Sequence, residues 1–112
     1  MATTQWYIEF LHDCFEDIPW VVTRLMFGEY ALYKSGKVIG LICDDICYIK
    51  ITESSKKILW EECQTGFPYP WAKAQFIIPE EILENREKLR ILFEKCAQEL
   101  PEKKKKTKKS IL

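Results

Sequence analysis

The chain has 112 residues and a mass of 13.3 kDa, which is the size of one ordinary domain. Hydrophobic residues make up 47% of it and aromatic residues 13%, a composition that excludes a chain disordered throughout. Its longest apolar run, residues 38–43, is far shorter than the ~20 residues that cross a bilayer, and no basic stretch leads into an apolar one at the N-terminus. We therefore expect a cytoplasmic protein without membrane association.

The formal net charge of zero hides a strong asymmetry along the chain. Six of the 17 basic residues lie in the last ten positions, so the rest of the chain carries 11 basic against 17 acidic residues, a net charge of −6. We predict a domain over residues 1–101 and a disordered lysine-rich tail over residues 102–112. The tail is either a solvated segment or a weak, non-specific contact for nucleic acid through counterion release. Its lysines are Lys103, Lys104, Lys105, Lys106, Lys108 and Lys109.

The first predicted element is a helix over residues 5–17. Apolar residues recur there at steps of three and four, the spacing of one helix face. Pro19 ends the helix, because it cannot continue the hydrogen-bond ladder and pushes Ile18 out of the helical region. The apolar face consists of Tyr7, Phe10, Leu11, Cys14, Phe15 and Ile18.

Residues 24–51 have the texture of β-strands, with short β-branched and aromatic runs between turn signals. We predict strands at Leu25–Tyr33, Val38–Cys43 and Ile46–Ile51, joined by turns at residues 34–36 and 44–45. They form an antiparallel meander. Alternation places Cys47, Ile49 and Ile51 on one face of the last strand and Ile46, Tyr48 and Lys50 on the other.

A second helix is predicted to begin after residues 52–55, where Thr52, Ser54 or Ser55 is a suitable cap. It runs to about Gln64, and Gly66 provides its left-handed stop.

The rest of the domain is expected to be extended and then helical. Two prolines keep residues 67–70 out of a helix, and a short strand follows at Gln75–Ile78. Pro79 and the acidic pair after it start a last helix, which runs to about Leu100 with an interruption near Asn85. The whole pattern predicts an α+β fold, in which an antiparallel meander of three to four or more strands packs against N-terminal and C-terminal helices.

Catalytic and metal-binding patterns are absent from the sequence. Its one histidine, His12, is two residues from Cys14 on the predicted helix, so the two side chains point to different faces. No phosphate-binding loop or zinc-hydrolase motif occurs, and no two cysteines have the C-x-x-C spacing. Cys43 and Cys47 are close enough to approach each other across a turn, but we interpret the five cysteines as buried reduced thiols. We predict no enzyme, no metal and no cofactor.

One aromatic segment of the sequence is a candidate for binding. Residues 67–70, Phe-Pro-Tyr-Pro, and Trp71 combine large apolar area with low conformational entropy. Two interpretations stay open: the segment packs over the sheet, or it forms a groove for a ligand or partner.

An ordered set of short motifs over about residues 5–100 resembles the TfoX/Sxy N-terminal domain family. The segment from Arg24 to Tyr33, RLMFGEYALY, is similar to the family's R-x-M-F-G-G-Y-G-L-Y signature, with Glu29 and Ala31 in place of its second and third glycines. The other matching pieces, in order, are Gly36 with residues 38–42, Asp44-Asp45, Tyr48-Ile49-Lys50, Phe67-Pro68-Tyr69, and residues 78–84, IPEEILE, which are similar to the family's V-P-D-E-V-L-E.

The resemblance implies a non-enzymatic α+β domain, here in a stand-alone copy. It also implies a link to the transcriptional control of natural competence, in which members assist the cyclic AMP receptor protein. We therefore expect an adaptor that contacts a protein partner such as the transcription machinery, with a homodimer left open; a small-ligand-binding domain is a further alternative. The expected contact surface comprises Arg24, Met26, Phe27, Glu29, Tyr30, Tyr48 and Lys50.

Overall fold

The computed structural model describes residues 3–26, 28–59 and 63–100. Its six strands form one sheet in the order β1-β2-β3-β4-β6-β5, in which every neighbouring pair is antiparallel. The strands are β1 (Val21–Met26), β2 (Glu29–Lys34), β3 (Lys37–Cys43), β4 (Ile46–Ile49), β5 (Thr65–Gly66) and β6 (Gln75–Ile77). The predicted α+β class and its antiparallel sheet are confirmed.

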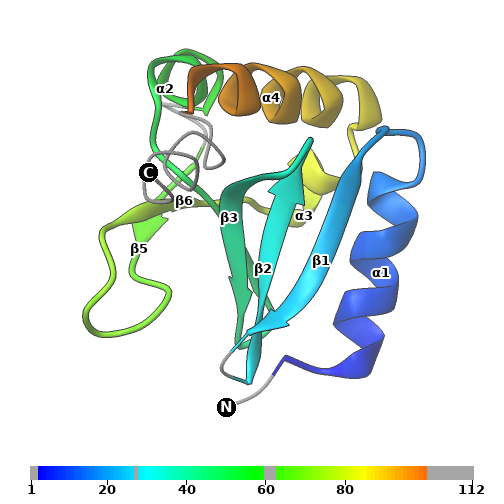
Figure 1. Ribbon diagram of the computed structural model, residues 1–112, viewed down its shortest axis with the longest axis vertical. Helices are drawn as coiled ribbons and strands as arrows, with labels where there is room; N and C mark the ends of the chain where they lie inside the picture. Colours follow the sequence, from blue (N-terminus) through cyan, green and yellow to red (C-terminus); the bar gives the residue numbers. More distant parts are fainter. Residues whose placement is uncertain (1–2, 27, 60–62, 101–112) are drawn as a thin grey trace, which may run out of the picture.

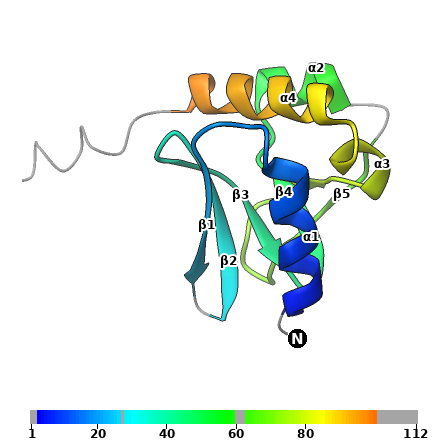
Figure 2. The same cartoon turned by 90° about the vertical axis from the view of Figure 1, so that its right-hand side faces the viewer.

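In the described residues four helices accompany the sheet: α1 (Gln5–Phe15), α2 (Glu53–Leu59), α3 (Glu80–Leu83) and α4 (Arg86–Glu99). The first lies along the strands, whereas α2 and α4 lie side by side across one end of the sheet (Figures 1 and 2). None of the helices in the described part of the chain is long and apolar enough to cross a membrane.

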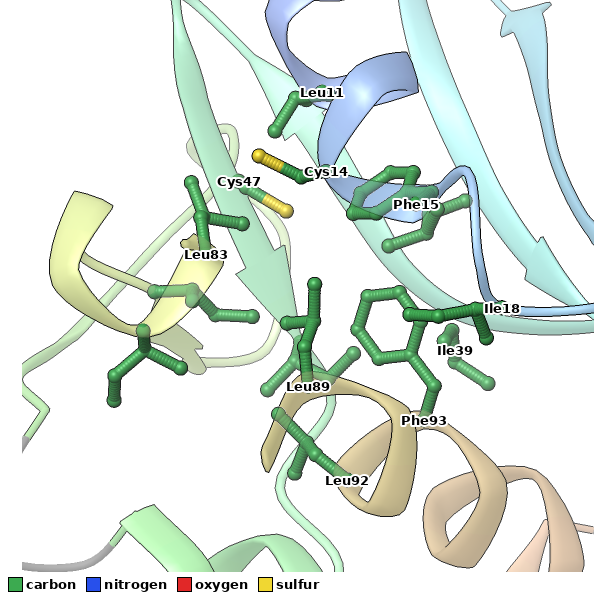
Figure 3. Packing of buried hydrophobic residues seen from close by; sticks show 14 of the residues in the cluster. Leu11, Cys14, Phe15, Ile18, Ile39, Cys47, Leu83, Leu89, Leu92 and Phe93 are labelled. Atoms are coloured by element: carbon green, nitrogen blue, oxygen red, sulfur yellow. The ribbon is translucent and has the colours of Figure 1, made fainter. Parts of the chain in front are cut away.

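The main core lies between the helices and one face of the sheet, which we call the inner face. Figure 3 shows side chains from α1, β3, β4, α3 and α4 meeting there. The rings of Phe15 and Phe93 join the first and last helices edge to face, with centroids 5.3 Å apart. A second, smaller cluster on the outer face contains Ala31, Leu41, Cys43 and Tyr48.

Local chemistry explains where the long helices begin and end. Thr4 caps α1 by accepting a hydrogen bond from the backbone N–H of Tyr7, and the helix ends four residues before Pro19. The expected interruption of the last helix is confirmed at Asn85, whose side chain accepts from the N–H of Lys88 and so caps α4. Pro79 precedes the short α3, as predicted.

The predicted strand Leu25–Tyr33 is wrong, because the chain folds there into a hairpin of two strands. Met26 pairs with Glu29, and Gly28, which lies between them in the chain, has φ +84°. The next two hairpins are the predicted ones, and all four of their turn residues, 35–36 and 44–45, have positive φ, as tight two-residue hairpins require.

A bulge in β3 decides which of its residues face the core. The pairing between β2 and β3 shifts between Leu32 and Tyr33, so Ile39 is left without a direct partner. As a result Ile39 lies in the main core, although Leu41, two residues further on, lies on the outer face.

Helix α2 is described over Glu53–Leu59, and residues 60–62, over which the helix was predicted to continue, lie outside the described residues. Two further predictions need correction. Gly66 belongs to β5 instead of stopping a helix. A β-carbon at Gly66 would lie 2.9 Å from Cδ1 of Ile77, so the missing side chain makes room for this partly buried residue of the neighbouring strand β6. Cys43 and Cys47 do not approach each other, because they lie in the outer cluster and the main core respectively.

Candidate functional site

An apolar groove opens on the outer face of the sheet. Its volume is about 690 Å³, and it lies between the ends of β1, β2 and β3 and the loop that joins β5 to β6. We call it the outer groove. It is lined by Met26, Glu29, Tyr30, Leu41, Cys43, Asp44, Pro68, Tyr69, Pro70 and Trp71.

The β5–β6 loop supplies the aromatic wall of the outer groove. Its backbone turns at residues 69–72, where the N–H of Ala72 donates to the carbonyl of Tyr69 over 3.0 Å. The side chain of Trp71 is 88% exposed and that of Tyr69 is 49% exposed. The segment therefore lines a groove and leaves much of its aromatic surface exposed.

Glu29 fixes the end of the groove by joining three parts of the chain. Its carboxylate accepts hydrogen bonds from the N–H of Thr3 (3.0 Å), the hydroxyl of Thr3 (2.6 Å) and the N–H of Asp44 (3.0 Å). Asp45 supports the same corner, since its carboxylate accepts from the N–H and hydroxyl of Thr4. The turn between β3 and β4 is thereby held against the start of α1.

The one thiol in the groove is not an activated nucleophile. Burial raises the pKa of Cys43, and the nearby carboxylates of Glu29 and Asp44 raise it further, so the thiol stays protonated at neutral pH. His12 is remote from the groove and lies 3.0 Å from the hydroxyl of Thr23. Within the described ranges, no three His, Cys, Asp or Glu residues come together as metal ligands.

Three of the predicted contact residues, Met26, Glu29 and Tyr30, line the groove, although Tyr30 also packs against the main core. Arg24 lies outside it on the same face, with its guanidinium 5.7 Å from the ring centroid of Tyr33. The backbone N–H of Lys50 donates to Ile39, away from the groove. Phe27 lies outside the described residues, as do the six tail lysines.

Tyr48 needs a correction, because it is buried instead of exposed. It packs in the outer cluster opposite Leu41, and burial raises the pKa of its hydroxyl group. Sequence reasoning also missed Leu41, Cys43 and Asp44 as groove residues. Only the pairing of β3 with β2 brings them beside Met26 and Glu29, although the turn signal at Asp44 was visible in the sequence.

Comparison with known proteins identifies the family of this chain. The family model of the TfoX N-terminal domain matches residues 13–100. A protein of Spirochaeta aurantia, described as an uncharacterized 12.7 kDa protein in the trpE 5′ region, is 34% identical over 101 residues, which cover 90% of this chain and 86% of the relative. The chain therefore belongs to the TfoX N-terminal domain family.

Proposed function

We propose that this protein is a non-enzymatic adaptor that docks a protein partner of the transcription machinery in its outer groove. The observation that carries the proposal is the wall formed by Tyr69 and Trp71, which exposes aromatic area beside an apolar floor. Large aromatic side chains in such positions commonly dominate the binding energy of protein interfaces.

The chemistry of the groove supports docking over catalysis. Its titratable residues are a carboxylate held by hydrogen bonds, a protonated thiol, two tyrosines and Asp44, and its lining contains no histidine or lysine that could serve as a base at neutral pH. Two prolines stiffen the wall, which lowers the entropy lost on binding. The transcriptional part of the proposal is supported by family membership, through the link to competence control that the motifs imply.

The proposal is tested by direct binding to purified RNA polymerase and to the purified cyclic AMP receptor protein on promoter DNA. We expect one of them to bind the protein, and we expect Trp71→Ala to weaken that binding at least about thirtyfold, as loss of an aromatic hot spot does. The matched control is Trp6→Ala, because Trp6 is 67% exposed and lies on α1, outside the outer groove. Equal binding by both variants, or no binding of either candidate, would reject the proposal.

A further inference from the structure

Strand β1 forms a free edge of the sheet. It is the first strand in the sheet order, so no strand of the described residues pairs with its outer edge, and α1 lies beside it on the inner side (Figures 1 and 2). Two of its apolar residues that lie outside the outer groove are exposed, Val22 by 49% and Leu25 by 68%. The strand contains no proline and one cation, Arg24, so it lacks most of the features that keep sheet edges from pairing.

The ladder between β1 and β2 determines which backbone groups face this edge. The N–H of Ser35 donates to the carbonyl of Trp20 over 2.9 Å, so this pair is hydrogen-bonded. Hydrogen-bonded pairs alternate with non-hydrogen-bonded pairs along an antiparallel ladder. Counting in steps of two from Trp20, the pair of Met26 and Glu29 at the end of the hairpin is also a hydrogen-bonded one. Val21, Thr23 and Leu25 therefore direct their N–H and C=O groups away from β2, toward the free edge.

Side-chain direction limits how a second strand can pair there. Thr23 faces the inner side, where its hydroxyl lies 3.0 Å from Nε2 of His12, and Val21 packs on the main core. Arg24 faces the outer side, over the ring of Tyr33. The side chains of residues that lie opposite each other in neighbouring strands point to the same face of the sheet. A second copy of β1 can therefore pair only when its odd-numbered residues lie opposite the odd-numbered residues of the first copy.

Only one symmetric register satisfies these conditions over most of the strand. Pairing about Arg24 would place two guanidinium groups directly opposite each other, which is unfavourable. Pairing about Val22 would use only residues 21–23 of the strand. We infer that a second copy of this chain pairs with β1 in antiparallel fashion, with Thr23 opposite Thr23 of the other copy.

This register matches both the backbone and the side chains of the edge. The outward groups of residues 21–25 can form about six hydrogen bonds across the symmetry axis. Val21 then lies opposite Leu25 of the other copy, and Val22 lies opposite Arg24, whose stem covers it. The two sheets become one continuous sheet. The contact is small, so we expect dissociation in the micromolar range, and it goes beyond the proposed docking function because it uses a different surface.

Symmetric disulfide formation tests the register. In Thr23→Cys, the two new cysteines would have Cα atoms about 5.5 Å apart, within the range that a disulfide spans. In the control Val22→Cys, the corresponding atoms would be about 8 Å apart, beyond that range. Under mild oxidation we expect a covalent dimer from Thr23→Cys and none from Val22→Cys or the unmodified chain. Equal yields from the two variants would overturn the register.

Substitutions that place like or opposite charges at residue 23 of the two copies test whether the chain dimerises. Sedimentation of the unmodified chain from about 10 µM to about 1 mM should show a reversible monomer–dimer equilibrium. Thr23→Lys and Thr23→Glu, at a half-buried position, should each weaken it about fivefold by placing like charges opposite each other. An equimolar mixture of the two should restore dimers. A chain that stays monomeric throughout, or a mixture that behaves as its separate components, would overturn the inference.

Discussion

A β-carbon at Gly40 would lie 2.0 Å from the carbonyl oxygen of Tyr48. It would also lie 3.1 Å from the Cα atom of Ile49, the residue that pairs with Gly40 across β3 and β4. Both obstacles are main-chain atoms in the middle of the sheet. Neither can move without breaking the ladder that supports the outer cluster and the main core at once.

Gly40→Ala should therefore be strongly destabilising. We expect a loss of about 3 kcal/mol in the free energy of unfolding, since overpacking against backbone cannot be relieved by a side-chain rotation. The measurement is urea unfolding followed by circular dichroism. Gly28→Ala is the control: its β-carbon would meet no atom within 4 Å, so only its φ of +84° is strained, at a cost of about 1 kcal/mol. Equal losses would contradict this account of Gly40.

The helices could be predicted from sequence because their signals are local. The recurrence of apolar residues at steps of three and four, together with Pro19 and Pro79, located α1 and the start of the last helical region within a few residues. The β1–β2 turn was missed because the apolar run from Leu25 to Tyr33 is interrupted only by Gly28 and Glu29. A single glycine in a strand pattern is also compatible with a bulge.

The outer groove could not be predicted as a unit, because its walls meet only through long-range pairing. Trp71 and Met26 are far apart in sequence, and the order in which β6 and β5 follow β4 brings the loop back over the sheet. The same topology brings strand β5 close to Tyr48, which is buried: a β-carbon built at Gly66 of β5 would lie 3.6 Å from Cε2 of the Tyr48 ring. No local pattern encodes either neighbour.

Glu29 contributes stability at a position where the family signature has glycine. Glu29→Ala removes a carboxylate that accepts three hydrogen bonds from Thr3 and Asp44, and we expect it to cost about 1–2 kcal/mol in urea unfolding. Glu29→Gln keeps an amide oxygen as acceptor and should cost about half as much. Stability unchanged in Glu29→Ala would show that these bonds contribute nothing in solution.

The buried thiol of Cys47 should make the fold sensitive to alkali. Burial raises the pKa of Cys47 from 9.0 to about 12. Above about pH 9 the unfolded chain loses this proton and the folded chain keeps it, so the stability present below pH 9 is lost as the pH rises toward 12, by about 1.4 kcal/mol per pH unit.

The measurement for Cys47 is urea unfolding at several pH values between about 8 and 11. Cys47→Ala should be less stable at pH 8, because it leaves a small cavity, yet its stability should fall less steeply with pH. The comparison cancels the contributions of the other titrating groups, including Cys14 and Cys96, whose pKa values burial also raises. Parallel pH profiles would show that Cys47 ionises in the folded protein.

The lysine tail predicts a defined salt dependence for any binding to DNA. Six lysines that each neutralise one phosphate would give a slope of about −5 for the logarithm of the binding constant against the logarithm of the salt concentration. Binding to duplex DNA of random sequence, measured by fluorescence anisotropy at low salt, tests this value. A chain ending at Leu100 should lose the binding, because the remaining domain is acidic and repels phosphates. Binding that survives the truncation would instead place the contact on the folded domain.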